Sequence, residues 1–403
     1  MGPLYIFTFI SCLFLIVYGI LIAWYLRAWT SIPPVTRPAA WRTWRTWITV
    51  IVPARNEEGN ILSCLGALAA QNYPKHLYEV IVVDDHSTDG TARVAEEFVA
   101  GPGGRSGADL RSGLTVTCIR LSEQEDRGGR AAHKKWAIES GIRAARGQLI
   151  VATDADCVAQ PGWLASIAAC YEDKGAKFIA APVRIGGGPV GGEAHSLLSI
   201  FQTLDFITLQ GITGASVYRR FHSMCNGANL AYDKSAFEEV GGFKGIDAIP
   251  SGDDMLLMHK IYCKYPQRVF FLKDREAIVT TQPETRWSGF FHQRIRWASK
   301  ADQYDDKRIF WVLLLVYLVN LLFAGLFVAA FWNSWWLWIL LLMLVVKIAV
   351  EYPFVRSVAG FFGQQRLMVY FAVLQPLHIL YTIIVGWLGK FGSYQWKDRK
   401  IRK

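Results

Sequence analysis

Two pairs of aspartates follow apolar, strand-like runs in this chain of 403 residues. Asp84 and Asp85 directly follow the apolar run 80–83, and Asp154 and Asp156 follow a second run of the same kind. If the second pair lies in an extended segment, its two side chains share one face. Carboxylate oxygens are ligands that Mg²⁺ and Mn²⁺ prefer, and such an ion would bridge to the phosphates of a nucleotide. The acids therefore predict a site for a nucleotide and a divalent cation.

Alternating strands and helices are predicted to position these acids. Apolar runs predict strands at 47–52, 80–83, 114–121 and 149–152. The intervening segments predict helices at 60–71, 91–99 and 131–145. This alternation is typical of an α/β fold with a mostly parallel, doubly wound sheet, whose ligands bind at the carboxyl ends of the strands. Glycine-rich segments at 101–113 and 186–192 are predicted to be loops, and the second lacks the strand–GxGxxG–helix setting of a dinucleotide site.

Apolar segments at both ends predict a membrane protein. Hydrophobic residues make up 52% of the chain, and its mean hydropathy is +0.21. Residues 4–26 carry no charge and are long enough to span the ~30 Å bilayer core. Residues 309–346 also lack charge, and an Asn-Ser turn in their middle predicts two spans there. A third C-terminal span is predicted at 367–388, although two polar residues and a proline lie near its centre.

The flanking charges predict the orientation in the membrane. The N-terminal segment is predicted to be an uncleaved anchor, because no basic residue precedes it and no small-residue cleavage site follows it. Arginines between residues 27 and 45 then place the following domain in the cytoplasm by the positive-inside rule. We therefore expect a multi-pass protein of a bacterial inner (plasma) membrane. Three later spans would put the basic tail 397–403 outside, which conflicts with the same rule.

Charge and cysteine usage exclude other classes of protein. The net charge is +10, but much of the Lys and Arg lies at 27–45, 286–308 and 397–403, beside the membrane segments. Such clusters meet anionic lipid headgroups, so no nucleic acid is predicted as a partner. The seven cysteines form no CxxC pair, which argues for reduced thiols and against a zinc site or a disulfide framework.

Further motifs follow one another in a fixed order along the chain. They are Val52-Pro53-Ala54-Arg55-Asn56-Glu57, the run 82–91, Lys134, Asp154-Ala155-Asp156, Asn226-Gly227-Ala228-Asn229, Val240-Gly241-Gly242-Phe243, Gly252-Asp253-Asp254 and Gln293-Arg294-Ile295-Arg296-Trp297. With this series the chain resembles the inverting family 2 glycosyltransferases, including the membrane-bound group related to cellulose, chitin and hyaluronan synthases. The resemblance covers residues 47–297 and implies a Rossmann-like GT-A catalytic domain flanked by transmembrane helices.

The resemblance also implies roles for individual residues. Asp84 and Asp85 would recognise the base, and Asp154 and Asp156 would hold Mg²⁺ or Mn²⁺ on the donor diphosphate. The implied donor-binding residues are Pro53, Ala54, Arg55, Glu57, Asp84, Asp85, Lys134, Asp154, Gln293, Arg296 and Trp297. The implied acceptor-binding residues are Asn226, Gly227 and Trp297.

An inverting transfer also needs a base, because an acceptor hydroxyl must lose its proton as it attacks the anomeric carbon. The resemblance implies Asp254 as this base with Asp253 in support, although the family more often has glutamate at the first position. An ordinary helix-capping role is the alternative for Asn56, Glu57, Asp85, Ser87, Asp253 and Asp254. Lys135 is the alternative to Lys134, and one of the two lysines would then be a solvated helix residue.

Residues 287–298 are predicted to form a helix with two distinct faces. One face is apolar and comprises Trp287, Phe290, Phe291, Ile295 and Ala298. The other face is polar and comprises Gln293, Arg296, Trp297 and Lys300. The first face suits the membrane surface, and the second suits contact with a diphosphate and a sugar.

These patterns divide the chain into six predicted regions. They are an anchor at 1–27, a juxtamembrane linker at 28–46, a cytoplasmic GT-A domain at 47–285, an interfacial amphipathic helix at 286–308, a C-terminal region of about three spans at 309–390 and a basic tail at 391–403.

The predicted function is metal-dependent, inverting transfer of a sugar from a nucleotide-sugar donor, a UDP-sugar, to a membrane-associated lipid or lipid-linked glycan acceptor. A processive polysaccharide or oligosaccharide synthase is the alternative that the QxxRW motif favours, although such synthases usually carry more spans. An inactive membrane scaffold is a third possibility, against which the intact acids argue. A dehydrogenase is excluded by the missing glycine fingerprint.

Overall fold

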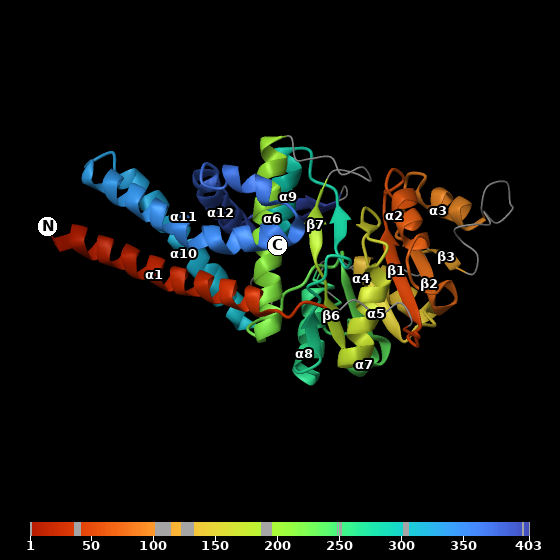
Figure 1. The fold of residues 1–403 in the computed structure, drawn as a ribbon. Coiled ribbons are helices and arrows are strands. Elements are labelled where there is room, and N and C mark those ends of the chain that lie inside the picture. Colours follow the sequence, from red (N-terminus) through yellow and green to blue (C-terminus); the bar gives the residue numbers. More distant parts are fainter. Residues whose placement is uncertain are drawn as a thin grey trace. The chain divides into compact units, whose positions relative to one another are not determined.

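A seven-stranded sheet with the order β3-β2-β1-β4-β8-β6-β9 forms the centre of one of two structural units (Figure 1). The computed structural model describes residues 2–35, 42–100, 114–121, 133–186, 196–247, 249, 252–300, 306–396 and 399–402. The sheet-containing unit comprises Pro33–Glu193 and Ser223–Gln282. The helical unit comprises Met1–Ile32, Ala194–His222 and Pro283–Lys403.

The strands of the large sheet are short and mostly buried. They are β1 (Ile48–Ala54), β2 (Tyr78–Asp84), β3 (Thr115–Arg120), β4 (Leu149–Ala152), β6 (Phe178–Ala180), β8 (Leu230–Asp233) and β9 (Val269–Phe271). All neighbours pair in parallel except β8, which is antiparallel to both β4 and β6. Strands buried on both faces need continuous apolar runs, as β1 and β2 have. The predicted α/β fold with a mostly parallel sheet is therefore confirmed.

Helices connect these strands. They are α2 (Ile61–Ala69), η1 (Lys75–Leu77), α3 (Thr91–Ala100), α4 (His133–Ala144), α5 (Trp163–Lys174), α7 (Lys234–Glu239) and α8 (Met255–Lys264). Of these, α2, α3 and α4 correspond to the three helices that the sequence predicted. A second, three-stranded sheet joins β5 (Val158–Ala159), β10 (Val279–Thr281) and β7 (Val183–Ile185). The predicted loop at 101–113 and most of the one at 186–192 lie outside the described residues.

The register of the large sheet brings four loops to one edge. Ala54 at the end of β1 pairs with Asp84 at the end of β2, and Ile51 pairs with Ala152 at the end of β4. Because β8 runs in the opposite direction, its first residue, Leu230, lies beside Ala152. The segments after β1, β2 and β4 and the segment before β8 therefore share the edge where ligands of parallel sheets bind.

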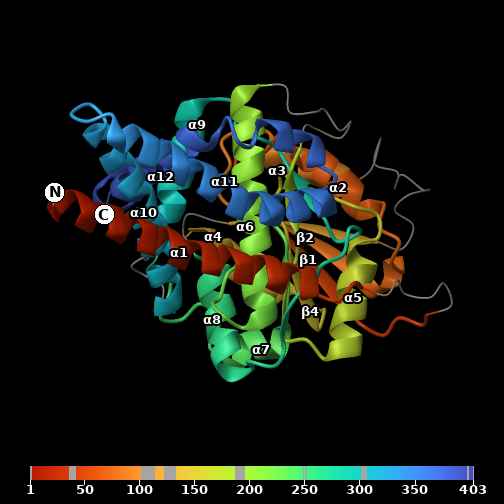
Figure 2. The same cartoon turned by 60° about the vertical axis from the view of Figure 1, so that its left-hand side comes forward.

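The helical unit contains three helices that are long and apolar enough to cross a membrane, among the residues that the structure describes. Its elements are α1 (Gly2–Ser31), α6 (Leu197–Arg219), α9 (Trp287–Ala298), α10 (Lys307–Ala329), α11 (Trp335–Phe362), η3 (Gln365–Tyr370), α12 (Gln375–Phe391), β11 (Ser393–Trp396) and β12 (Arg399–Arg402). The candidate spans are Ile6–Ser31, Lys307–Ala329 and Trp335–Phe362. Figure 1 and Figure 2 show that α1 and α11 lie side by side and that α6 crosses both.

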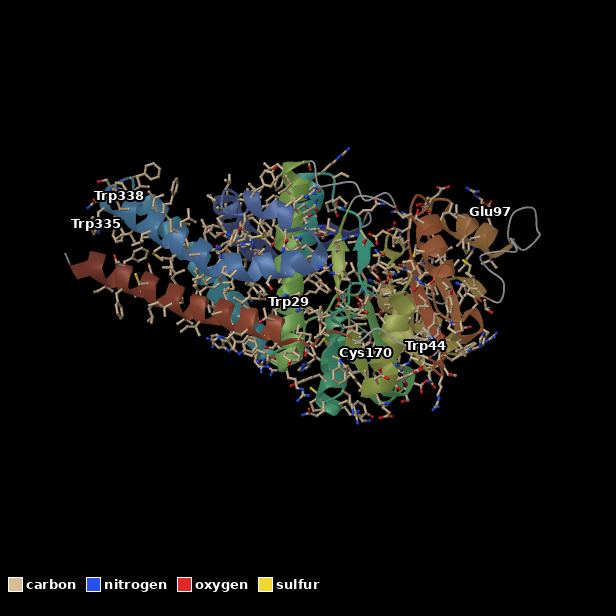
Figure 3. All side chains as sticks on the ribbon, in the orientation of Figure 1. Trp29, Trp44, Glu97, Cys170, Trp335 and Trp338 are labelled. Atoms are coloured by element: carbon tan, nitrogen blue, oxygen red, sulfur yellow. The ribbon has the colours of Figure 1, made fainter. Side chains whose placement is uncertain are left out.

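The turn between α10 and α11 carries exposed aromatic side chains. The predicted turn is confirmed, and there the amide of Trp335 donates to the side chain of Asn333. Phe331, Trp332, Trp335 and Trp338 are all exposed, and the last two lie at the far end of the hairpin (Figure 3). Aromatic side chains gathered in this way are typical of a segment at the membrane–water interface.

The predicted span at 367–388 is wrong as a single continuous helix. Helix η3 ends at Tyr370, and α12 begins at Gln375 with Pro376 in its first turn. Proline lacks an N–H donor and clashes with the preceding turn, so it is tolerated at a helix start but not in the interior. Helix α12 is not among the three candidate spans of the described residues.

A buried polar network fixes the start of α12 against two long helices. Lys347 of α11 is fully buried and donates to Gln375 at 2.6 Å, and it pairs with Glu351 at 2.7 Å. Gln375 donates in turn to Glu351 at 2.7 Å, and Tyr18 of α1 donates to the same carboxylate. Each polar atom therefore has a partner, as charges in an apolar surrounding require.

Helix α6 shows a difference from the predicted domain boundaries. Its sequence lies within the predicted catalytic domain at 47–285, but its contacts group it with the helical unit. Periodicity along the sequence cannot reveal this grouping, because the grouping depends on which partners cover the helix.

All seven cysteines are free thiols, as predicted.

Asn229 holds the core of the sheet-containing unit together at the motif edge. It is fully buried, accepts a hydrogen bond from the indole of Trp163 at 2.9 Å, and donates to the carbonyls of Pro182 and Ala277, each at 2.8 Å. This member of the Asn226–Asn229 motif therefore has a structural role.

We expect Asn229→Ala to destabilise the protein by about 3 kcal/mol, because one donor and two acceptors lose their buried partner. The midpoint of thermal unfolding in detergent should fall by about 5–10 °C. Asn72→Ala, at an exposed asparagine, is the matched control and should leave the midpoint unchanged. An unchanged midpoint for Asn229→Ala would contradict the structural role.

Candidate active site

The loops after β1 and β2 form a cluster around Asp84 and Asp85. Both aspartates are buried, and Arg55 donates to the backbone carbonyl of Asp85 at 2.8 Å. The guanidinium of Arg55 also lies 4.0 Å from the Asp85 carboxylate, and His86 Nδ1 lies 3.0 Å from it. Positive or polar groups thus hold Asp85 in place as a fixed acceptor.

Asp84 presents a buried acceptor with unused capacity. Its Oδ2 accepts a hydrogen bond from the amide of Ser87 at 3.3 Å. Its Oδ1 is buried and has no hydrogen-bond partner in the described part of the chain. Buried polar atoms are almost always paired, so an unpaired one suggests a partner that binds.

Side chains for which helix capping was the alternative role tie the two loops together. The amide of Asn56 donates to Ser87 Oγ at 3.0 Å, and the side chain of Asn56 accepts from the amide of Thr88 at 2.9 Å. Asp89, not Asp85 or Ser87, caps α3 by accepting from the amide of Thr91 at 3.0 Å. The capping alternative for Asn56, Asp85 and Ser87 is therefore wrong.

The backbone of this cluster adopts an uncommon conformation at two positions. Asn56 has φ of 52° and His86 has φ of 56°, both in the left-handed region. Residues other than glycine rarely occupy that region, and they do so where surrounding contacts hold them.

Glu57, the remaining capping candidate, accepts from the side chain of Asn60 at 2.7 Å. Pro53 and Ala54 form the end of β1 next to this loop.

Lys134 of α4 links the two predicted acid motifs further along the chain. Its Nζ lies 2.7 Å from Asp154 Oδ1 and 3.6 Å from Asp253 Oδ2. Burial opposes the charge on this ammonium, but the carboxylates of Asp154 and Asp253 outweigh it and hold the pKa of Lys134 well above its usual value. Lys134 therefore stays charged throughout the physiological range.

The expectation that one of Lys134 and Lys135 is a solvated residue is wrong. Lys135 is buried and donates to the carbonyls of Ile246 at 2.6 Å and Ile249 at 2.8 Å. Its role is to bind the backbone of the segment that leads to the Asp253-Asp254 motif. A charged amine can replace missing backbone donors in this way.

Asp254 is both a helix cap and a neighbour of the Asn226-Gly227 segment. Its Oδ1 accepts from the amide of Met255 at 2.7 Å, which caps α8, and its Oδ2 accepts from the amide of Gly227 at 3.0 Å. The capping alternative is thus confirmed for Asp254, whereas Asp253 faces Lys134. The base role predicted for Asp254 stays a prediction.

Gly227 allows the close approach of these groups. A Cβ atom at this position would lie 3.3 Å from Lys134 Nζ and 3.4 Å from Asp253 Oδ2. The side chain of Asn226 accepts from the amide of Ala228 at 3.0 Å, which stabilises the turn that precedes β8. The structure therefore brings Lys134, Asp154, Asp253, Asp254 and Gly227 into one cluster.

Asp154 and Asp156 lie in a turn, so the expectation of an extended pair on one face is wrong. Strand β4 ends at Ala152, where its pairing with β1 ends, and the amide of Cys157 donates back to the carbonyl of Asp154 at 3.1 Å. Asp154 faces Lys134, and Asp156 accepts from Thr281 Oγ1 of β10 at 3.3 Å.

This pair offers an oxygen-only donor set that fits a divalent cation. Among the described residues, no group of three or more His, Cys, Asp or Glu side chains is placed to hold a metal by itself. Mg²⁺ is usually bound by one or two carboxylates together with substrate phosphates and water. Asp154, whose side chain is 35% exposed, is accessible to such ligands.

The QxxRW residues belong to the helical unit. Gln293 Nε2 lies 3.4 Å from Glu284 Oε1, and Trp297 packs on Phe206 with ring centroids 6.1 Å apart. Arg296 is partly exposed. The donor and acceptor roles of Gln293, Arg296 and Trp297 stay predictions.

The predicted contact of the apolar face of this helix with a membrane surface stays a prediction. Phe290 and Ile295 are buried, Trp287 is exposed, and Arg294, which was assigned to neither face, is only 2% exposed. Arg294 pairs with Asp205 of α6 at 2.9 Å, and neither residue was among the predicted site residues. The one available signal was Asp205 itself, the single acid in the apolar segment that forms α6.

Comparisons with known proteins identify the family of the chain. Residues 149–386 match the model of the glycosyl transferase family group 2, and residues 49–241 match that of glycosyl transferase family 2. Glycosyltransferase AglE of Haloferax volcanii is 27% identical over 234 residues, which are 55% of this chain and 68% of that protein. The probable glycosyltransferase YdaM of Bacillus subtilis is 27% identical over 262 residues, which are 64% of this chain and 55% of that protein.

A human protein and a solved structure extend the comparison. The dolichyl-phosphate beta-glucosyltransferase of Homo sapiens is 34% identical over 128 residues, covering 30% of this chain and 34% of that protein. The mannosyltransferase PcManGT of Pyrobaculum calidifontis, solved with GDP-Man and Mn²⁺, has a TM-score of 0.55 at 19% identity and covers 94% of this chain and 98% of its own. That likeness concerns the fold. The chain belongs to the glycosyl transferase family group 2, and it is a glycosyltransferase.

Proposed function

We propose that this glycosyltransferase moves a sugar, with inversion, from a UDP-sugar to a membrane-associated lipid or lipid-linked glycan. The observation that carries the proposal is the cluster of Lys134, Asp154, Asp253, Asp254 and Gly227 at the edge of the sheet. It combines an ammonium, a cation-binding carboxylate and a candidate base. Donor activation and proton removal both require such groups.

The donor half of the site begins at the loops after β1 and β2. The unpaired Oδ1 of Asp84 suits the ring N–H of a uracil, and Asp85 is oriented by Arg55 and His86. Other nucleobases with a ring N–H, such as guanine, are the natural competitors. We propose a uridine nucleotide because Oδ1 is the one oxygen of Asp84 without a partner in the described residues, and uracil presents a single N–H donor, whereas guanine presents an exocyclic amino group beside its ring N–H.

The departing nucleoside diphosphate needs positive charge. Mg²⁺ or Mn²⁺ bound by Asp154 and Asp156 would neutralise the charge that develops on the diphosphate. The Mn²⁺ in the PcManGT complex supports this proposal. Lys134 adds a permanently charged ammonium beside Asp154.

The acceptor is proposed to be associated with a membrane. Within the described part of the chain, three helices are long and apolar enough to cross one, and exposed tryptophans lie at the hairpin between two of them. The human relative is named for a dolichyl-phosphate acceptor, which supports a lipid phosphate or a lipid-linked glycan. The QxxRW motif favours the alternative of a processive polysaccharide or oligosaccharide synthase.

The chemistry of the acceptor decides whether a base is needed. A sugar or lipid hydroxyl must lose a proton during attack, whereas a phosphate monoester is already ionised near neutral pH. Asp254 is proposed as the base for a hydroxyl, and Asp253 is the alternative. Loss of the base should therefore affect the two acceptor classes differently.

Two crossing helices after the catalytic segment would resolve the conflict over the basic tail. If α1, α10 and α11 cross and α12 does not, the tail returns to the side of the sheet-containing unit. We propose that this side is the cytoplasm of a bacterial cell, as the positive-inside rule expects.

Removing the cation should abolish transfer. We expect chelation to stop nucleotide release from the UDP-sugar in purified, detergent-solubilised protein, and added Mg²⁺ or Mn²⁺ to restore it. Asp154→Asn should lower kcat by about 10²–10³-fold, because the leaving diphosphate loses its counter-charge. Asp173→Asn, at an exposed carboxylate paired with Arg42, is the control. Full activity in chelator would refute the metal assignment.

Asp254→Asn should separate proton transfer from donor binding. Asparagine is as good a helix cap as aspartate, so α8 should remain intact. With a hydroxyl acceptor, kcat should fall by about 10²–10⁴-fold while the Kd for UDP stays within about twofold. With a polyprenyl phosphate, most of the rate should remain. Asp233→Asn, at the cap of α7, is the matched control. An undiminished rate on a hydroxyl acceptor would move the base elsewhere, with Asp253→Asn tested next.

Reporter fusions should define the topology. A reporter at Lys403 and one inserted in the sheet-containing unit should both report the cytoplasm, whereas one at the Asn333-Ser334 turn should report the outside. A reporter at Lys403 on the outside would show that the chain crosses the membrane once more than proposed.

A further inference from the structure

Arg294 is a buried cation in the middle of the QxxRW helix. It is 2% exposed, and its guanidinium lies 2.9 Å from the carboxylate of Asp205, which is 8% exposed. Its three nitrogen atoms form no well-aligned hydrogen bond within the described residues. The charge of Arg294 is therefore stabilised by the ion pair with Asp205 and by the side chains that enclose the guanidinium.

Aromatic rings enclose the same guanidinium. Its central carbon lies 4.1 Å from the ring centroid of Trp297, 5.0 Å from that of Phe290 and 5.9 Å from that of Phe206. All three distances are within the range of a cation–π contact, which is strongest when both partners are desolvated. Arg294 and Trp297 lie three residues apart, so they are neighbours on the helix surface.

Helix α6 supplies two of the side chains that contact the Arg294 guanidinium of α9. Asp205 and Phe206 are adjacent on α6, and both face the α9 guanidinium, one by charge and one by its ring. His378 of α12 adds a third element, with Nε2 3.8 Å from Asp205 Oδ1. This cluster contacts the Trp297 indole directly, and it helps to set the rotation of α9 together with the packing of Phe290 on Phe201 and Tyr381.

We infer that Arg294, held by Asp205, is a positioning residue that fixes the Trp297 indole for contact with the acceptor. This inference rests on the proposed function, in which Trp297 belongs to the acceptor site. Lysine could replace the charge of Arg294 but not its planar stacking surface. The acceptor sugar or headgroup would contact the Trp297 indole. It would not contact the Arg294–Asp205 ion pair, which orients that indole.

Replacing both partners of the ion pair can separate its effect on folding from its effect on Trp297. A buried ion pair contributes little net stability, and an apolar pair of similar volume often replaces it without loss of folding. A variant with Asp205→Leu and Arg294→Met should therefore fold, but it should lose the guanidinium that orients Trp297. Stability and acceptor recognition can thus be measured separately.

The test compares this double variant with wild type in detergent-purified full-length protein. We expect thermal unfolding midpoints within a few degrees, an unchanged Kd for UDP and unchanged slow hydrolysis of the UDP-sugar in the absence of acceptor. The KM for acceptor should rise, lowering kcat/KM for transfer by about 10²-fold. Arg294→Lys serves as a second, conservative variant and should show the same change in KM with intact folding.

The outcomes are distinguishable from failure of the proposed function. Wild-type kcat and KM for the acceptor in either variant would overturn the positioning role. Trp297→Ala with an unchanged KM for the acceptor would instead remove Trp297 from the acceptor site and overturn the inference at its premise. Loss of UDP binding in a folded Arg294→Lys variant would contradict the inference too, because it would place Arg294 with the donor.

Discussion

The parallel pairing of β2, β1 and β4 is the constraint on which the candidate active site depends. Because the three strands share a direction and a register that aligns Ala54 with Asp84 and Ile51 with Ala152, their carboxyl ends stop at one edge. The antiparallel β8 then delivers the Asn226–Asn229 segment to the same edge from the other direction. A slip of one residue would turn every following side chain to the opposite face. The positions of the candidate site residues therefore depend first on the register of the sheet and then on the conformation of each loop.

Charge balance is the second feature of this edge. Acids crowd there, and their mutual repulsion would be costly without a partner. Lys134 supplies that partner by lying between Asp154 and Asp253, and a divalent cation on Asp154 and Asp156 would add to it. Asp254 is bound differently, because both of its oxygens accept from backbone amides. The two adjacent acids thus have distinct surroundings, as a supporting residue and a base would require.

Much of the fold could be predicted from the sequence, because β1, β2 and β4 contain continuous apolar runs that are followed by polar residues. Side-chain partners could not be predicted. Asp89 caps α3 instead of Asp85, and Lys135 binds backbone carbonyls in the interior, because both outcomes depend on contacts distant in the sequence. The break before α12 follows from Pro376, which lies in the first turn of that helix. The length of the apolar run favoured one continuous span, although this proline lies near its centre. The grouping of α6 with the helical unit had no local signal apart from Asp205.

We propose that the acceptor half of the reaction depends on the helical unit, where the Arg294–Asp205 ion pair lies beside the Trp297 indole. A structure of the full chain with a uridine diphosphate-sugar and Mn²⁺ would test the proposed donor site most directly. We predict Mn²⁺ beside Asp154 and the uracil ring hydrogen-bonded to Asp84. Nucleotide and metal bound away from the carboxyl edge of β1, β2 and β4 would contradict it.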